Sequence, residues 1–410
     1  MIRPRHVGAA LAAAAAIAGA AATAGAQDPG QTTTVFTFEG RGWGHGIGLS
    51  QYGARGRALA GWSAGRILRH YYRGTSLTKR PGRSVRILLS SGRRSVVVSS
   101  PRPWRAVGAR TKGRRVTPLP AGVAHRLRAR RDGRLALERG RRSVAVFTGR
   151  VRLQARGRGG VLAWGARRPE SERRYRGALR AVPSGGGFDL VNVVGLEDYL
   201  KGVVPREMPA SWGDDAFAAL VSQAVAARSY ALATMTPTAT YDVFDDDRSQ
   251  VYGGVAAEDR RTSRAVDATR GRVLTYDGEV ITAFFFSTSG GRTEDVQNVF
   301  PSSAPKPYLV SVPDSFDRLS PYHSWPDPPS FTAAGLGRAL ELGGPVARVT
   351  VLRRGVSPRV REARVTTRSA ARQTVMTGTE IRSALGLRDT WFTVRERVVP
   401  AATAARLVGG

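Results

Sequence analysis

The segment 196–212 restricts the backbone more than any other part of this sequence, because it places two prolines around one glutamate, Glu207. Pro205 and Pro209 each fix their own φ and push the preceding residue out of the helical region. The turn that carries Glu207 therefore has few conformations. We expect Glu207 to lie on a short, rigid link between two helices, which is how a reactive carboxyl group would be held in one direction.

The stretches on both sides of this link have the apolar spacing of buried helices. On the N-terminal side, Leu196, Leu200 and Val203 fall on one helical face. On the C-terminal side, an Ala-rich helix is predicted from about Asp214 to Ala233. Its expected inward residues are Phe217, Leu220, Val221, Ala224 and Val225.

Two roles are open for Glu207 at this point. A glutamate at a helix end can be an ion-pair partner, and perturbed carboxyl groups also occur in structural networks. Met208 and Trp212 favour the catalytic role, because an apolar wall disfavours the carboxylate and keeps a general acid protonated near neutral pH.

The N-terminus has the pattern of a secretory signal peptide. Arg3 and Arg5 precede an apolar run at 9–22 and a small-x-small site that ends at Ala26. No later segment has the long apolar run of a membrane helix. We expect an exported, cell-wall-associated protein whose mature chain starts near Gln27, with no stable transmembrane span after cleavage. An uncleaved run at 9–22 would instead tether the chain.

Cysteine is absent, so disulfides and thiolate chemistry are excluded and the fold must be stabilised by packing. The five histidines show no metal-ligand spacing such as His-x-x-x-His. They are His6, His45, His70, His125 and His323. The sequence therefore predicts no metal and no cofactor.

The formal net charge is +33, from 64 Lys and Arg against 31 Asp and Glu, and nearly all of the positive charge is arginine. Such a field favours a polyanion. Because an exported protein meets little nucleic acid, we expect anionic wall polymers as a partner and no nucleic acid. The alternative is a compositional bias of the genome without functional meaning.

The composition predicts an α+β fold in which a mixed helical and β core is joined to a β-rich, basic subdomain. The expected divisions are a signal peptide at 1–26, a glycine-rich segment at 27–79 that packs on the core, the basic subdomain at 80–182, the core at 183–398 and a disposable tail at 399–410. Arginine clusters at 126–134, 139–142 and 173–176 form either a docking face for wall polymer or a solvated surface.

The glycine-rich segment follows a predicted strand at 35–38 and reads Gly-Trp-Gly-His-Gly-Ile-Gly-Leu from residue 42. Glycine at every second position strips one strand face of side chains, so another backbone, an aromatic ring or a sugar can approach it. The spacing fits neither G-x-G-x-x-G nor a P-loop. Residues 50–72 then read as helical with glycine interruptions.

Further strands are predicted at 85–89 and 95–98, and Asp277-Gly278 between two apolar runs, 271–276 and 280–287, indicates a hairpin. The second run leads into a polar loop, Ser287–Thr293, that is suited to ligand binding but is equally an ordinary turn. Near the C-terminus we expect strands around 346–351 and 363–367 and a helix at 378–385.

These segments together resemble the stage II sporulation protein D / LytB family, whose members act on bacterial peptidoglycan. The resemblance covers most of residues 41–394. The matching pieces are Leu196–Trp212, Gln223–Tyr230, Gln250–Gly254, Ala265–Gly271, Ser287–Thr293 and Gly42–Ala54.

The sequence departs from the family pattern in two ways. The Gly-Trp-Gly-His-Gly segment, which in the family follows a stretch like 378–392, precedes everything else here. This indicates a circular permutation, so residues 41–54 should pack against the strand after Phe392. In addition, some members have Cys and His where this chain has Phe244, Arg248 and Ser249. The zinc site of those relatives is therefore absent.

Family membership implies lytic transglycosylase chemistry on peptidoglycan glycan strands, with Glu207 as the catalytic acid. A hydrolase generally needs two carboxyl groups. A lytic transglycosylase can use one, since its nucleophile is the 6-hydroxyl of the substrate's own N-acetylmuramic acid, and the product is a 1,6-anhydro sugar. The resemblance also implies a glycan groove lined by Tyr199, Gln223, Arg228, Gln250, Tyr252, Ser289, Gly290, Gly291, Thr293, His45, Gln51 and Tyr52.

Alternatives stay open for several of these residues. Gln223 and Arg228 could form buried structural hydrogen bonds, and His45 could satisfy a backbone carbonyl. Two other functions compete with the transglycosylase: a non-catalytic, wall-binding enhancer of an N-acetylmuramoyl-L-alanine amidase, and a two-carboxylate hydrolase. The hydrolase would pair Glu207 with Glu197, Asp198 or Asp214.

Overall fold

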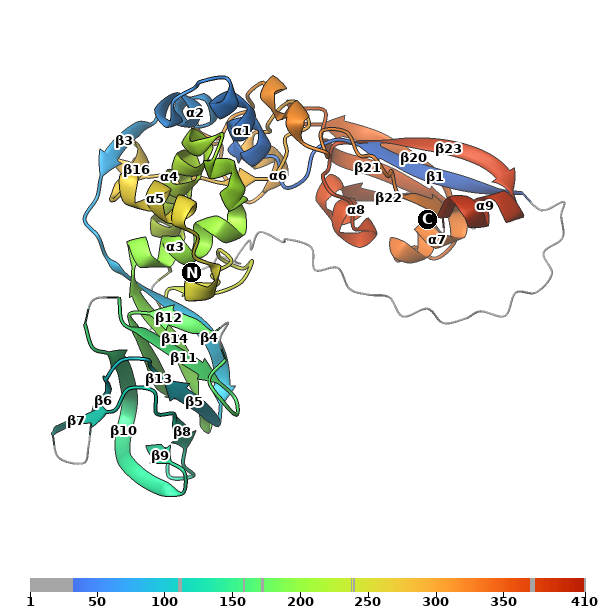
Figure 1. Ribbon diagram of the computed structural model, residues 1–410. Coiled ribbons are helices and arrows are strands. Elements are labelled where there is room, and N and C mark those ends of the chain that lie inside the picture. The colour runs from blue at the N-terminus through green and yellow to red at the C-terminus, as the bar shows by residue number, and fades with distance from the viewer. Residues whose placement is uncertain are drawn as a thin grey trace. The chain divides into compact units, whose positions relative to one another are not determined.

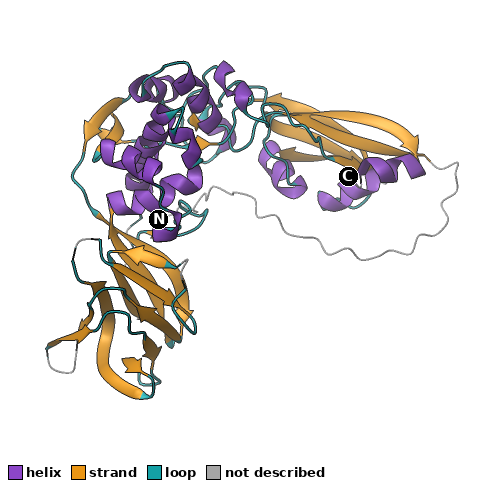
Figure 2. Cartoon of the chain, viewed as in Figure 1, coloured by secondary structure: helices purple, strands orange, loops and turns teal. Residues whose placement is uncertain are grey.

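The computed structural model describes residues 32–109, 113–157, 159–170, 173–236, 238, 240–368 and 373–408. They form two compact units, each described by itself below. The first contains residues 76–283, and the second combines residues 32–75 with the chain from 284 onward. Helices and strands alternate irregularly and the sheets are mostly antiparallel, which confirms the α+β class (Figure 2). The expected signal peptide lies outside the described residues. Within them, no helix has the length and apolarity needed to cross a membrane.

A large sheet dominates the first unit. Its strands follow the order β12-β11-β5-β8-β9-β10-β13-β14-β4-β15, and β6 and β7 extend it from β10. The bounds are β4 Ser84–Arg93, β5 Ser95–Ser99, β6 Trp104–Ala109, β7 Arg114–Leu119, β8 His125–Ala129, β9 Leu135–Arg139, β10 Arg142–Ala155, β11 Val161–Gly165, β12 Arg174–Arg176, β13 Ala178–Ser184, β14 Gly187–Gly195 and β15 Val243–Phe244. The predicted strands at 85–89 and 95–98 are confirmed. Alternating residues such as Val151 and Leu153 are fully buried, because successive side chains of a strand point to opposite faces.

The rest of the first unit is mainly helical, and Figure 1 shows α3, α4 and α5 together next to the ends of β12 and β14. The bounds are α3 Leu196–Glu207, η1 Ala210–Gly213, α4 Phe217–Thr234, η2 Gly254–Ala257, α5 Arg260–Ala268, β3 Ser76–Lys79, β16 Arg272–Tyr276 and β17 Glu279–Val280. The predicted inward residues of α4 are buried at Leu220, Ala224 and Val225, whereas Phe217 and Val221 are half-buried.

The predicted hairpin is confirmed, but its second strand is shorter than expected. Asp277 and Gly278 both have positive φ, 48° and 80°, as a two-residue type I′ turn requires, and Thr275 pairs with Val280. The expected continuous strand over 280–287 is wrong. β17 ends at Val280, and β18, Phe285–Phe286, pairs in parallel with β2, Leu49–Ser50, in the second unit.

The predicted break before Pro205 is also wrong, because α3 continues through this proline to Glu207. The amide of Met208 still donates to the carbonyl of Val204 at 3.0 Å. Proline lacks a donor and is disfavoured inside helices, but here it lies in the last turn. The restriction before Pro209 is as expected, since Met208 is extended at φ −132° and ψ 132°.

In the second unit, β1 is the central strand of a three-stranded antiparallel sheet, and a second sheet has the order β20-β21-β22. The bounds are β1 Thr32–Gly40, β19 Ser330–Thr332, β20 Val346–Arg354, β21 Val360–Thr367, β22 Gln373–Thr377, β23 Phe392–Pro400, α1 Gln51–Leu59, α2 Ala64–Tyr71, α6 Val296–Val299, η3 Ser315–Leu319, α7 Ala333–Ala339, α8 Gly378–Leu385 and α9 Ala401–Val408. The predicted strands and the helix at 378–385 are confirmed, and the helical stretch 50–72 is interrupted between α1 and α2. A capping box of Thr377 and Glu380 begins α8.

The N-terminal glycine-rich segment contacts residues just before β23, whereas the permutation predicted packing against the strand after Phe392. β1 pairs with β23 over the full length of both strands. Beyond β1, the amides of Arg41 and Gly44 donate to the carbonyls of Trp391 and Arg388, at 3.0 and 2.9 Å. The rings of Phe38 and Phe392 are 5.4 Å apart in the core between the strands. The contact therefore forms at and just before the start of β23.

The sequence region treated as a tail, 399–410, is ordered structure over 399–408. β23 extends to Pro400, and α9 follows. Val399 and Ala404 are buried against Val35. These residues add a small apolar cluster to the edge of the first sheet of this unit.

Candidate functional site

Glu207 is the last residue of α3 and is half-buried. The extended backbone of Met208 and the turn at Pro209 direct the chain into η1, where Trp212 is buried. Met208 itself is 1% exposed. The proline-restricted backbone at Met208 therefore fixes the helix end that carries this carboxyl group, although α3 reaches further than expected.

Burial raises the pKa of Glu207 from 4.5 to about 7. A hydrogen bond from the backbone N–H of Val251 acts in the opposite direction and does not offset the burial. At neutral pH such a carboxyl group is present in both protonation states. It can therefore donate a proton in one step and accept one in the next.

The charge of Glu207 affects the pKa of two tyrosines. Its carboxylate contributes to raising the pKa of Tyr199 and of Tyr230, after the larger effect of their own burial. The ring of Tyr199 lies 5.1 Å from that of Tyr252, and its hydroxyl donates to Gln250 Oε1 at 3.4 Å. The structure thus brings Tyr199, Gln250 and Tyr252 together beside the end of α3.

Gln223 lies on the buried side of α4 and is fully inaccessible. Neither its Oε1 nor its Nε2 has a hydrogen-bond partner among the described residues. Leaving a buried polar group unpaired costs about 1–3 kcal/mol. Such a side chain marks either a place for a ligand or water, or a local strain in the core.

Arg228, on the same helix, has a structural environment. Its guanidinium is fully buried and pairs with both oxygens of Glu197, at 3.1 and 2.6 Å. It also donates to the carbonyls of Val266 and Arg272. Glu197 accepts a further bond from the amide of Gly271. Both side chains are thus used in joining α3, α4 and the end of α5.

Asp245 is a candidate that the sequence reading missed. It is half-buried, and burial raises its pKa to about 6. Its charge contributes to the raised pKa of Tyr199, as that of Glu207 does. The carbonyl of Asp245 accepts from the amide of Tyr252 at 3.0 Å. Asp245 is the first of three consecutive aspartates, 245–247, that lie shortly before Gln250. This acidic run is the sequence signal that points to the position.

The positions where some relatives have metal ligands contact one another directly. The amide of Phe244 donates to Ser249 Oγ at 3.1 Å, and the guanidinium of Arg248 lies 3.8 Å from the Phe244 ring centroid. Arg248 also pairs with Asp246 at 2.7 Å. A cation–π contact, a hydrogen bond and an ion pair therefore hold the loop 244–249 together. Among the described residues, no group of His, Asp and Glu could hold a metal ion.

The other predicted groove residues belong to the second unit. Ser289 and Gly290 donate to the buried Asp317, at 2.9 and 2.6 Å. Gly291 N–H donates to Ser289 Oγ, and Thr293 Oγ1 accepts from the amide of Val312 at 2.8 Å.

Two further groove candidates begin α1. Gln51 is its first residue and is buried. Tyr52 is half-buried, and its amide donates to the carbonyl of Ser287 at 3.1 Å. The Tyr52 amide thereby attaches the start of α1 to the polar loop 287–293. A role of this loop in glycan binding stays a prediction.

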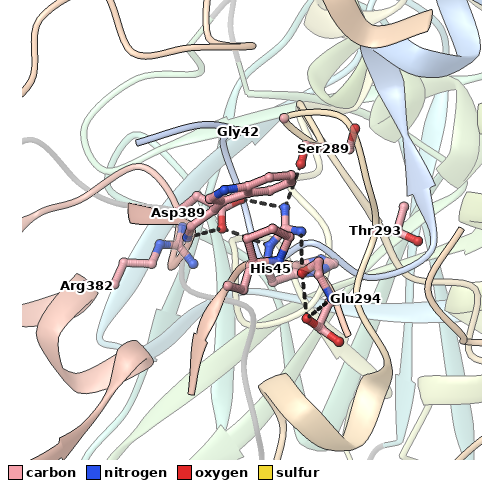
Figure 3. Close-up of polar contacts among 12 residues, drawn as sticks. Gly42, His45, Ser289, Thr293, Glu294, Arg382 and Asp389 are labelled. Carbon is pink, nitrogen blue, oxygen red and sulfur yellow. Dashed lines mark hydrogen bonds and ion pairs between the residues drawn. The ribbon is translucent and has the colours of Figure 1, made fainter. Parts of the chain in front are cut away.

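His45 is held by two backbone groups. The Ile47 amide donates to Nδ1 at 3.1 Å, so the Nε2–H donates to the carbonyl of Phe285 at 3.0 Å. Burial, followed by the charge of Arg382, lowers the pKa of His45 to about 3. The imidazole is therefore neutral and structural in this arrangement (Figure 3).

A buried ion pair lies in the same cluster. Arg359 and Asp389 are 1% and 0% exposed, and two 2.9 Å bonds join the guanidinium to the carboxylate. Arg359 also donates to the carbonyls of Ser289 and Arg292. Gly46 lies so close to Arg359 that a Cβ at this position would collide with the guanidinium. Arg359 thereby connects the glycine-rich segment to the polar loop.

Glu294 completes this cluster (Figure 3). Its buried carboxylate accepts from the amides of Asp295, Val356 and Ser357 and from the side chains of Asn298 and Ser357, at 2.5 to 3.0 Å. The polar groups of the second unit's cluster are therefore used in binding one another.

Comparison with known proteins supports the family resemblance. Residues 184–276, which contain Glu207, Gln223, Arg228, Gln250 and Tyr252, match the family described as "SpoIID: Stage II sporulation protein". The matched stretch includes α3, α4 and α5 of the first unit. The part of the chain that carries the raised-pKa carboxyl group is thus a SpoIID domain.

Several curated relatives are similar over limited regions. An uncharacterised protein of Brachyspira hyodysenteriae is 38% identical over 34% of this chain and 37% of its own length. The amidase enhancer of Bacillus subtilis is 46% identical over 29% of this chain and 15% of its own length. Stage II sporulation protein D of the same organism is 33% identical over 39% of this chain and 51% of its own length.

Residues 184–276 therefore form a SpoIID domain, and the curated relatives named stage II sporulation protein D support the resemblance to the SpoIID/LytB family. The matches span at most about half the length of these relatives. The family model matches the part of the chain in which the candidate site of the first unit lies.

Proposed function

We propose that this protein is an exported peptidoglycan lytic transglycosylase that cleaves the bond between N-acetylmuramic acid and N-acetylglucosamine, with Glu207 as acid and base. The observation that carries the proposal is the half-buried carboxyl group of Glu207, whose pKa burial raises to about 7, inside the SpoIID domain. A general acid is most effective when its pKa lies near the working pH.

The reaction needs one proton donor and acceptor. Glu207 donates its proton to the glycosidic oxygen while the bond from that oxygen to C1 of N-acetylmuramic acid breaks. The resulting carboxylate then takes the proton of the sugar's own 6-hydroxyl, whose oxygen forms the new bond to C1. The products are a free 4-hydroxyl on the leaving sugar and a 1,6-anhydro end, and Glu207 is protonated again.

Neighbouring residues support a single-carboxyl mechanism. Of the partners suggested for a two-carboxylate hydrolase, Glu197 is bound by Arg228, and Asp214 is an exposed residue paired with Arg261. Asp198, the third suggested partner, is half-buried and its charge contributes to raising the pKa of Tyr252. Asp245 is a further half-buried carboxyl group, and its charge acts on Tyr199 as that of Glu207 does. Asp198→Asn and Asp245→Asn therefore decide between the two mechanisms, because each variant should keep substantial activity if one carboxyl group is enough.

The test uses the mature chain from residue 27 with intact and peptide-stripped glycan, and mass spectrometry of the products. We expect 1,6-anhydro ends from wild type, loss of cleavage by Glu207→Gln of about a hundredfold or more, and substantial activity in Asp198→Asn and in Asp245→Asn. Glu170→Gln, which removes an exposed carboxyl group of the same unit, is the matched control. Reducing ends that disappear in Asp198→Asn or in Asp245→Asn would instead show a two-carboxylate hydrolase.

The second candidate is a non-catalytic enhancer of an N-acetylmuramoyl-L-alanine amidase, and the 46% identity to an amidase enhancer favours it. An enhancer would stimulate amidase digestion of cell walls without cleaving glycan itself. Stimulation that survives in Glu207→Gln, together with no cleavage by wild type, would replace the transglycosylase by this function.

A further inference from the structure

Three arginines converge on a hollow of the large sheet in the first unit, on strands that carry none of the residues proposed for glycan cleavage. Arg150 and Arg152 belong to β10, and Arg180 belongs to β13. The hollow has a volume of about 620 Å³. Its other lining residues are Val107, Gly108, Ala109, Gly113, Thr148 and Gly149. This volume is within the range of sites that hold a small molecule or a short polymer segment.

The strand register places like charges directly opposite each other. Arg152 faces Arg180 across the antiparallel pair of β10 and β13, and on its other side it faces Val107 of β6. Directly opposed like charges destabilise a sheet. Two arginines at this register position cost stability unless an anion binds between them.

Ion pairs with the described residues do not neutralise the charge of these three arginines. Among the residues that the structure describes, no carboxylate forms an ion pair with Arg150, Arg152 or Arg180. Other arginines of the same sheet do have partners, for example Arg128 with Glu138 at 2.6 Å. The three guanidinium groups therefore keep their donors available.

The charges around Arg180 confirm this imbalance. Burial and the charges of Arg152, Arg150 and Arg86, in that order, lower the pKa of Arg180. Asp242 acts in the opposite direction, but its carboxylate is already bound by Arg86, with a shortest contact of 2.6 Å. An anion in the hollow would relieve the repulsion on Arg180.

A β-bulge shapes one side of the hollow. The pairing of β10 with β6 shifts between Thr148 and Val151, so Gly149 and Arg150 have no opposite residue on β6. Gly149 has φ +74°, a conformation that favours glycine. Bulges redirect side chains and are common next to binding sites. Here the bulge places Arg150 beside the opposed pair.

We propose that Arg150, Arg152 and Arg180 form a phosphate-binding site that takes the phosphodiester groups of an anionic wall polymer. Guanidinium groups bind phosphate oxygens in a bidentate way, and three of them can reach several oxygens of one tetrahedral group or two successive groups of a chain. The site does not depend on the proposed reaction at Glu207. It also differs from the exposed clusters at 126–134, 139–142 and 173–176 that the sequence suggested.

The experiment compares two triple variants of the mature chain that lose the same charge. The site variant is Arg150→Gln/Arg152→Gln/Arg180→Gln. The control is Arg94→Gln/Arg167→Gln/Arg168→Gln, which changes three exposed arginines of the same unit outside the clusters 126–134, 139–142 and 173–176. The probe is immobilised poly(glycerol phosphate), with binding measured at about 50 mM and about 200 mM salt.

We expect the site variant to bind about tenfold or more weakly and to lose about two units of the slope of log K against log salt, since three phosphate contacts disappear. The control should lose less than about threefold, because exposed charges act through a screened field. Equal losses in both variants would overturn the proposal and indicate a diffuse basic surface.

Thermal melting supplies an independent readout of the same site. Inorganic phosphate should raise the Tm of wild type and of the control but not that of the site variant, because a ligand stabilises the state that binds it. Arg152→Lys keeps the charge but loses the planar guanidinium that binds two phosphate oxygens at once. It should therefore reduce the phosphate-induced shift in Tm even if the triple variant folds poorly. An unchanged shift in both site variants would contradict the proposal.

Single-stranded DNA is the competing polyanion. Because the proposed site recognises phosphates spaced along a wall polymer, DNA should compete more weakly than poly(glycerol phosphate) at equal phosphate concentration. DNA that binds more tightly, with the same dependence on Arg150, Arg152 and Arg180, would overturn the wall-polymer assignment.

Discussion

The two polar clusters of this protein differ in how fully their groups are bound. In the second unit, the buried carboxylates of Asp389 and Glu294 are surrounded by donors. In the first unit, the hydrogen bond from Val251 does not offset the burial of Glu207, and Gln223 has no partner among the described residues. A saturated polar cluster fixes a conformation, whereas an unsatisfied one keeps affinity for a proton or a ligand. The comparison separates a cluster whose polar groups are all bound from one that keeps unpaired groups.

The largest effect should come from breaking the saturated cluster. Arg359→Met leaves Asp389 buried without its cation, and this type of change typically costs about 3–5 kcal/mol. We expect the loss in the free energy of unfolding measured in urea, and faster hydrogen exchange in β1 and β23. Arg353→Met, which removes an exposed arginine paired with Glu362, should cost at most about 1 kcal/mol.

A double variant shows whether the charge or the packing is responsible. Arg359→Met/Asp389→Leu removes both charges, so it should recover much of the stability lost in the single variant. A single variant that unfolds at the same urea concentration as wild type would contradict the structural role of this pair.

The second effect concerns Glu294 in the same cluster. Glu294→Gln keeps the shape but turns one acceptor oxygen into a donor, which then faces either the amide of Val356 or that of Ser357. The loss of charge-assisted bonds should cost about 2 kcal/mol, measured by urea unfolding. Glu380→Gln at the exposed start of α8 is the control and should cost less than about 1 kcal/mol. Equal costs would show that burial adds nothing to the role of Glu294.

The same substitution should have the opposite sign at Glu207. Its folded-state pKa of about 7 is above the ordinary value of 4.5, so the folded state binds the proton more tightly and stability falls as pH rises through this window. Glu207→Gln removes that cost. We expect a gain of about 1–2 kcal/mol at pH 8, allowing for the partial exposure of the side chain, and almost none at pH 4. Urea unfolding at both pH values tests this, and a loss at pH 8 would contradict the raised pKa.

The sequence pattern predicted the helices and strands around both clusters better than it predicted the contacts between their side chains. Periodicity located β1, α8 and the Asp277 hairpin, because apolar spacing and turn residues are local signals. The end of α3 was misplaced, since the preference against helix before Pro205 is weaker than the tertiary packing of that helix. The prediction of a continuous strand at 280–287 is wrong because the chain passes from the first unit to the second within this stretch. A local sequence pattern does not encode such a transition.

Site residues were recognisable by type, but their roles needed the fold. Arg228 and His45 were each assigned a structural alternative, and both alternatives fit their contacts with Glu197 and with the Phe285 carbonyl. Asp245 was missed because its raised pKa depends on burial beside residues distant in sequence. The opposed Arg152 and Arg180 were not recognisable either, since strand register is not visible in a charge count.

The smallest effect, and the one that most sharpens the comparison, is expected at Gln223. If its unpaired amide lies in a core without a ligand, Gln223→Met replaces an unsatisfied polar group by an apolar one of similar size. Stability should then rise by up to about 1 kcal/mol. If the amide is instead reserved for glycan, the same variant should gain this stability and also lose cleavage activity. Urea unfolding and product analysis of one protein preparation therefore distinguish the two cases, with Ser222→Ala, which removes a hydroxyl bonded to the carbonyl of Ala218, as the neighbouring control. A marked loss of stability in Gln223→Met would show that the amide is bound by water, and Gln223 would then belong with the saturated groups of the second unit.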